Sequence, residues 1–291
     1  MNSLVTTASP GYAPTRPYNR VPKVTVDFWL IKLMAVTVGE TAADFLVTNL
    51  GFGLPMTSWV MSGFLVAALT IQFAQKKYVP WIYWITVVLI SVVGTLITDN
   101  LVDNLGITLE TTTIAFSLAL AVTFIVWYAF EKTLSIHTIY TTRREAFYWL
   151  AILFTFALGT AAGDLMAEGL GLGYLHAGIS YGLVIAAIAF AFFVLRMNGI
   201  LAFWLAYIIT RPMGASFGDL LSQPAANGGL GFGTTVTSAI FLTVITAVII
   251  YMTITHEGLE RARRRHQKEE EEEAASGQMR YKYDRPPVHR K

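Results

Sequence analysis

A frame of Trp, Gly and Asp that recurs four times constrains this chain more than any other feature of its sequence. In each copy a Trp is followed by a Gly ten residues later and by an Asp five residues after that, within an apolar run. The residue before the Asp is small in all four copies. The copies are Trp29, Gly39 and Asp44; Trp84, Gly94 and Asp99; Trp149, Gly159 and Asp164; and Trp204, Gly214 and Asp219. Such repetition predicts four copies of one supersecondary unit.

The apolar runs around these frames have the length that a bilayer requires. The chain is 54% hydrophobic and only 14% charged, against about 25% charged in an average soluble domain. About 20 apolar residues span a bilayer. This rule predicts eight spans, near 26–48, 56–76, 80–102, 111–131, 146–168, 175–195, 199–222 and 233–256. We therefore expect an all-α integral membrane protein in which each repeat is a hairpin of two transmembrane helices.

Lys and Arg residues lie almost entirely on one side of these spans. They are found in the N-terminal leader, in the loops at 76–77, 132–144 and 196, and in the C-terminal tail. Basic residues mark the cytoplasmic side, so we expect both termini in the cytoplasm and the protein in the cell (inner or plasma) membrane. A two-helix repeat returns the chain to the same side. The four copies should therefore be parallel, with a pseudo-twofold or pseudo-fourfold axis along the membrane normal.

A polar linker in the middle of the chain divides it into two halves. We expect a flexible cytoplasmic leader at 1–23, repeats 1 and 2 at 24–137, repeats 3 and 4 at 138–256, and a charged cytoplasmic tail at 257–291. The basic run at 261–265 is either an ordinary positive-inside signal or a contact with anionic lipid. The lipid bilayer is the expected partner, and the sequence leaves open whether the chain forms a homo-oligomer. No binding of nucleic acid is expected.

Three of the four frame Asp residues have a second carboxyl group four residues away, on the same helix face. The fourth has a Gln at that distance. Ionisable groups at membrane depth cost about 2.5–3.5 kcal/mol each on insertion scales and mark ion or substrate paths. We therefore predict an ion or solute pathway lined by Glu40, Asp44, Asp99, Asp103, Asp164, Glu168, Asp219, Gln223 and Arg211. The alternative is that these groups bond to neighbouring helices as packing contacts.

Two cations fall on the same stripes as the acids. Lys32 lies two turns before Glu40, and Arg211 lies two turns before Asp219. Both could neutralise carboxylates while the pathway is empty or bind an anionic substrate, and Lys32 could instead extend to the cytoplasmic surface. The frame Gly residues predict close helix packing, and the frame Trp residues predict an aromatic belt at the membrane interface.

No enzyme chemistry is expected. The chain has no Cys, which excludes thiolate nucleophiles and thiolate metal ligands. Its His residues form no zinc motif, no Gly-x-Ser-x-Gly elbow is present, and the glycine-rich loops follow no strand, which excludes a nucleotide site. We expect no tightly bound cofactor.

About residues 24–256 resemble a bacterial family of membrane-anchored proteins that has four tandem repeats of two transmembrane helices, each with a characteristic Trp. The resemblance is carried by GETAADFLVTNLG, ITDNLVDNLG, GTAAGDLMAEGLGLG and MGASFGDLLS. It implies a fold and no established activity. A looser similarity is to cation/proton exchangers with acidic motifs in paired repeats. Their E-x-G-D-[KR]-[ST] pattern is not reproduced here, so exchange chemistry is an analogy only.

The expected function is a secondary transporter for a cation, such as Mn2+, exchanged for protons. Without Cys or intramembrane His, the ligands would be oxygens, which suit Mg, Ca or Mn. The metal ligands predicted are Glu40, Asp44, Asp164 and Glu168. Two alternatives remain: a transporter or channel for a small anionic organic solute that Arg211 would bind, and a non-transporting membrane anchor or sensor that acts through the tail.

Overall fold

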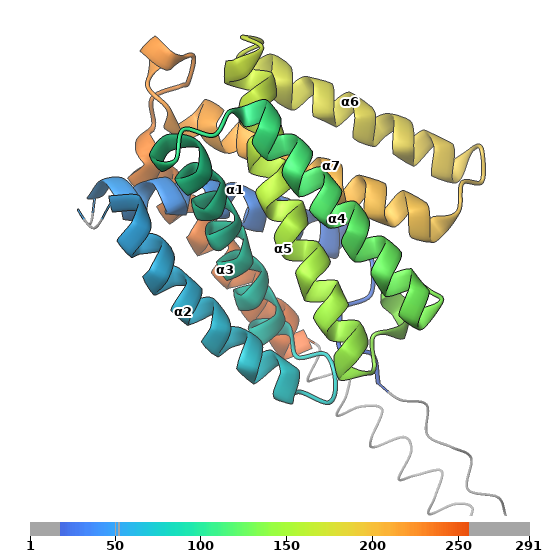
Figure 1. Ribbon diagram of the computed structural model, residues 1–291. Helices are drawn as coiled ribbons and strands as arrows, with labels where there is room; N and C mark the ends of the chain where they lie inside the picture. Colours follow the sequence, from blue (N-terminus) through green and yellow to red (C-terminus); the bar gives the residue numbers. More distant parts are fainter. Residues whose placement is uncertain (1–17, 50, 52, 256–291) are drawn as a thin grey trace, which may run out of the picture.

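The computed structural model describes residues 18–49, 51 and 53–255, and all the regular secondary structure of these residues is helical (Figure 1). The first seven long helices are α1 (Val26–Asn49), α2 (Gly53–Ala74), α3 (Pro80–Asp99), α4 (Leu109–Glu131), α5 (Thr142–Asp164), α6 (Tyr174–Phe193) and α7 (Gly199–Ser222). An eighth runs over Gly233–Thr255. The predicted tail at 257–291 and the leader up to residue 17 lie outside the described residues.

Seven of these helices are long and apolar enough to cross a membrane, within the part of the chain that the structure describes. The exception is α1, which carries Asp27, Lys32, Glu40 and Asp44. Charge is tolerated at membrane depth where it is shielded from lipid, and Lys32 and Glu40 are buried. The prediction of an all-α, multi-pass membrane protein is confirmed, and seven of the eight predicted spans are apolar enough to cross a membrane.

Local sequence explains where several helices begin. Pro80 opens α3 at a position where its missing N–H is not needed. The Thr141 side chain accepts a hydrogen bond from the Arg144 amide at the start of α5, and Asn198 caps α7 in the same way. Two helices end differently, because α3 and α5 continue into π-helical turns, η1 (Asn100–Asn104) and η3 (Leu165–Gly169).

The first helices of the four repeats form the interior of the bundle. They contact one another in the cyclic order α1, α3, α5, α7 and back to α1. Of the most apolar window of each helix, 72% is buried in α3 and 56% in α5 and α7, against 17–22% in α2, α4, α6 and Gly233–Thr255. The second helices therefore form an outer layer whose apolar side chains face lipid.

The outer helices pack across repeat boundaries. Figure 1 shows α2 beside α3, α4 beside α5 and α6 beside α7, so each second helix lies on the first helix of the next repeat. The last helix continues this pattern on α1, where Ser238 donates a hydrogen bond of 2.9 Å to the Thr41 hydroxyl. The two helices of one repeat therefore do not pack mainly on each other. The second helix of each repeat packs mainly on the first helix of the next repeat.

The frame glycines allow the inner helices to approach closely. In each copy, a Cβ added to the Gly would lie within 3 Å of a residue seven positions after the Trp of the next copy. The clashes are Gly39 with Ser91 Oγ at 1.8 Å, Gly94 with Phe156 Cβ at 2.8 Å, Gly159 with Arg211 Cγ at 2.1 Å, and Gly214 with Val36 Cγ1 at 2.4 Å. The packing role predicted for these glycines agrees with these contacts.

The frame Trp residues do not form a lipid-facing belt, and that prediction is wrong for three of them. Trp84, Trp149 and Trp204 are 0%, 3% and 4% exposed. They pack inside the bundle with other aromatic rings, as in the edge-to-face pair of Tyr83 and Trp84 at 5.0 Å. The reason is that the first helices are the inner helices, so large side chains on them fill the space between helices instead of reaching the membrane interface.

We call the end with the loops inside each repeat the hairpin end, and the end with the loops between repeats the linker end. At the linker end, part of the predicted leader is held in place. The Asn19 side chain donates to Ile136 O at 2.9 Å, and the backbone carbonyl of Asn19 accepts from the Tyr78 amide at 3.0 Å. Arg20 forms an ion pair of 2.7 Å with the buried Glu145. The expectation of a flexible leader therefore does not describe residues 19 and 20.

Candidate functional site

A cavity of about 170 Å³ lies among the inner helices towards the hairpin end. Its lining includes eight of the nine residues predicted for the pathway, which are Glu40, Asp44, Asp99, Asp103, Asp164, Glu168, Asp219 and Gln223. Val102 and Leu109 complete it. The ninth, Arg211, lies beneath and binds Glu40. The volume is sufficient for several water molecules, since one needs about 10–15 Å³ on this measure.

The lining follows the repeat. Positions 11, 15 and 19 after each Trp are one helical turn apart and share a face. The floor positions, 11 after the Trp, hold Glu40, Thr95, Thr160 and Ala215. The middle positions hold the four frame Asp residues, and the mouth positions hold Thr48, Asp103, Glu168 and Gln223. The floor residues are buried, whereas Asp103 and Glu168 at the mouth are exposed. The cavity therefore opens at the hairpin end.

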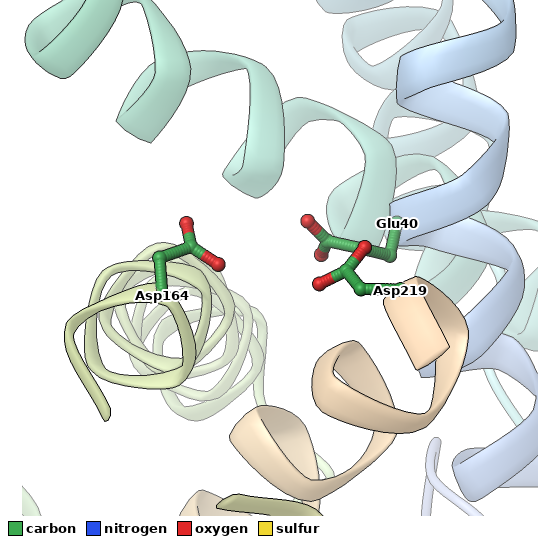
Figure 2. Close-up of side chains that lie close together, drawn as sticks. All are labelled: Glu40, Asp164 and Asp219. Atoms are coloured by element: carbon green, nitrogen blue, oxygen red, sulfur yellow. The ribbon is translucent and has the colours of Figure 1, made fainter. Parts of the chain in front are cut away.

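Three carboxyl groups converge at the inner end of the cavity. Glu40, Asp164 and Asp219 each offer an oxygen, and these oxygens lie within 4.8 Å of one another. Figure 2 shows the Asp164 carboxyl group on α5 facing those of Glu40 on α1 and Asp219 on α7. A hard divalent cation binds oxygens at about 2.0–2.6 Å, so two oxygens on one ion lie no more than about 5 Å apart. The group is therefore close to the geometry of such a site.

The predicted metal ligands are only partly brought together. Glu40 and Asp164 belong to the converging group, and Asp219, predicted for the pathway alone, joins them. Asp44 and Glu168 line the cavity outside this group. Gln223 Nε2 lies 3.5 Å from Asp44 Oδ2, and the Tyr174 hydroxyl donates to Glu168 at 2.8 Å. These two carboxyl groups thus lie nearer the mouth, with partners of their own.

Arg211 lies beneath the cavity and contacts residues at the floor positions. Its side chain is fully buried, and its Nη2 lies 2.8 Å from Glu40 Oε2. The same nitrogen donates to Thr95 Oγ1 at 2.6 Å and to Thr160 Oγ1 at 2.8 Å. Thr95 in turn donates to Glu40 Oε2 at 3.0 Å. A single nitrogen is therefore held by oxygens from α1, α3 and α5.

Below Arg211 the bundle is closed by packed side chains. Lys32 is 1% exposed and does not extend to the surface, so that alternative is excluded. Its Nζ donates to Tyr207 O at 2.6 Å and lies 3.8 Å from the centre of the Tyr207 ring. The hydroxyls of Tyr83 and Tyr148 are 2.5 Å apart. Backbone, hydroxyl and ring contacts thus connect the inner helices below Arg211.

Sequence reasoning missed Thr95 and Thr160, because an intramembrane Thr carries no charge to draw attention. A signal was nevertheless present. Both lie 11 residues after their Trp, the position that Glu40 occupies in the first copy. Aligning the repeats at that position would have placed both hydroxyls at the helix position equivalent to that of Glu40. Tyr174, which lies outside the frame, had no comparable signal.

A comparison with protein-family models matches the chain four times to the family described as Repeat of Unknown Function (DUF347), at residues 28–78, 82–133, 147–198 and 202–257. No curated protein and no solved structure matches the chain. The four matched segments coincide with the four Trp–Gly–Asp frames, and the resemblance to a family with four tandem repeats is confirmed. Together the matches cover more than half of the chain, and the protein therefore belongs to this repeat family.

Proposed function

We propose that the protein is a secondary transporter that exchanges a hard divalent cation, such as Mn2+, for protons. The observation that carries this proposal is the convergence of the Glu40, Asp164 and Asp219 carboxyl groups within 4.8 Å. They come from three different repeats and lie at the inner end of a cavity that is open to one end of the bundle. Such convergence of costly intramembrane acids is typical of an ion path.

The chemistry of the lining favours a hard divalent ion. The polar groups of the lining are carboxyl groups and one amide, and oxygen ligands suit Mg, Ca or Mn. At full ionisation the three converging carboxylates carry three negative charges, and this charge favours a doubly charged cation over a singly charged one.

Proton exchange follows from the ligands. A carboxyl group must be deprotonated to bind a metal, so metal binding releases protons. The cavity holds further carboxyl groups between the converging group and the mouth, including Asp44, Asp103 and Glu168. These residues provide a route for the released protons to the hairpin end.

The arrangement in the membrane is part of the same proposal. We propose that the four repeats are parallel and related by a pseudo-fourfold axis along the membrane normal. The cyclic contact of the inner helices and the four equivalent glycine contacts support it. The basic residues of the linker end support cytoplasmic termini. The cavity then opens to the outside, and the packed half below Arg211 closes the cytoplasmic side.

The geometry disfavours an anionic solute. Arg211, its intended partner, is fully buried and bound to Glu40. An incoming carboxylate would first have to pass seven acidic side chains in the lining, and like charges repel strongly in a medium of low dielectric constant. We therefore propose cation transport alone.

The test is transport by the full chain in proteoliposomes, with Mn2+ uptake and internal pH recorded together. Asp164→Asn and Asp219→Asn should each reduce uptake by about tenfold or more, because each removes one charged ligand from the ion. Glu110→Gln is the matched control: Glu110 is an exposed acid at the hairpin end, on α4, and is not part of the cavity lining. Wild-type uptake by both Asn variants, or uptake without proton movement, would overturn the proposal.

A further inference from the structure

The floor of the cavity already contains a cation that belongs to the chain. At the floor positions, Glu40, Thr95 and Thr160 direct oxygens from three repeats at one point, and the fourth repeat has Ala215 there. Arg211, one turn before Ala215, places its Nη2 at that point, 2.6–2.8 Å from the three oxygens. The fourth repeat therefore supplies a positive charge where the other three supply oxygens.

This Arg is held by one nitrogen only. Its side chain is fully buried, yet Nε and Nη1 have no hydrogen-bond partner among the described residues. A guanidinium group has five N–H donors, and buried donors without acceptors are costly. The observed position therefore leaves two guanidinium nitrogens without hydrogen bonds, so an arrangement that satisfies them can compete with it.

Glu40 is shared between Arg211 and the converging carboxyl groups. Its Oε2 accepts from Arg211 at 2.8 Å, and the same carboxyl group belongs to the set with Asp164 and Asp219. An ion bound by that set would lie beside the guanidinium group, where two positive charges repel each other with little screening. When Glu40 binds the cation, it therefore cannot also keep its ion pair with Arg211.

We propose that Arg211 is a built-in competitor for the cation, so that the ion and the guanidinium group alternate on Glu40. This inference rests on the proposed function and adds a mechanism of regulation to the same site. Nη2 joins α7 to α1, α3 and α5 at one point. Displacement of Arg211 by the ion releases these three contacts and opens the floor, which links occupation of the site to access from the linker end.

The experiment measures Mn2+ binding to the purified full chain in detergent by titration calorimetry at constant pH. Thr160→Val removes one acceptor from Arg211 and changes no charge. It should lower the Kd for Mn2+ by about tenfold, the factor that corresponds to a weakened hydrogen bond to a charged group. Arg211→Lys, which keeps the charge but loses the reach of the guanidinium group, should act in the same direction.

Thr155→Val is the matched control. Thr155 is buried on the same helix, and its hydroxyl has no partner among the described residues, so Mn2+ binding should not change. If Thr160→Val does not fold, Arg211→Lys decides the question. If both variants bind Mn2+ with wild-type affinity while Asp219→Asn abolishes binding, Arg211 does not compete with the cation, and the proposed cation site remains supported. If neither the wild type nor any variant binds Mn2+, both the proposed cation site and the proposed competition by Arg211 are wrong.

Discussion

The same four inner helices build two halves of opposite character. Towards the hairpin end they line a cavity with acids, and towards the linker end they close the bundle with rings such as Trp84 and Tyr148. One position of the first half holds Asp in all four copies. In the second half, position 3 after the Trp holds a different residue in each copy: Lys32, Val87, Ile152 and Tyr207.

This difference has a packing reason. Protein interiors are as dense as organic crystals, and four identical side chains around one axis leave gaps or clash. At position 3 after the Trp, in the closed half, the copies have therefore diverged to side chains of different size that interdigitate. In the cavity the space between the helices is available to water or an ion, so the same Asp can be repeated without steric conflict. The frame Asp is thus the same in all four copies where it lines the cavity, whereas the residue at position 3 after the Trp differs in every copy.

The sharpest test of this comparison uses the absence of native Cys. Asp103→Cys at the exposed mouth should be labelled fully by a membrane-impermeant thiol reagent applied to the hairpin-end side. Ile152→Cys in the closed half should remain unlabelled from either side, because Ile152 is 0% exposed. Mass spectrometry of right-side-out and inverted vesicles measures both. Rapid labelling of Ile152→Cys would show that the linker half is not sealed.

A smaller effect is expected at the contacts between the inner helices. Gly94→Ala should destabilise the protein by about 3 kcal/mol, near the upper end for overpacking. The added Cβ would lie 2.8 Å from Phe156 Cβ and 3.1 Å from the Ala157 backbone nitrogen, which cannot move independently. Gly63→Ala on α2, where nothing lies within 4 Å, is the control. Thermal unfolding in detergent compares them, and equal stability would contradict the close approach of α3 and α5.

The smallest effect concerns the hydroxyl pair of the closed half. Tyr148→Phe should cost about 1 kcal/mol, the usual net value of one hydrogen bond, because Tyr83 loses its partner at 2.5 Å. Tyr128→Phe on the outer helix α4, where the ring is 56% exposed, should be neutral. Unfolding of both variants in detergent provides the comparison. A loss of stability in Tyr128→Phe alone would reverse the assignment of inner and outer layers.

Much of the fold was accessible from the sequence, because each span carries its own signal. A run of about 20 apolar residues must be a helix in a bilayer, since its backbone groups have no other partners. The eight predicted spans accordingly agree with the helices within a few residues, except at the start of α5, where the chain enters the helix at Thr142. The packing of α2 on α3, α4 on α5 and α6 on α7 was not accessible, because apolar outer faces resemble one another and do not specify a neighbour.

The candidate site divides in the same way. The repeat of the frame by itself determined that the acids lie on one face of each first helix, because residues four apart share a face whatever the tertiary structure. Only the tertiary structure decided that Glu40, Asp164 and Asp219 converge, that Thr95 and Thr160 hold Arg211, and that three of the four frame Trp residues point inward. These facts depend on which inner helices are neighbours, and helical periodicity contains no information about distances between helices.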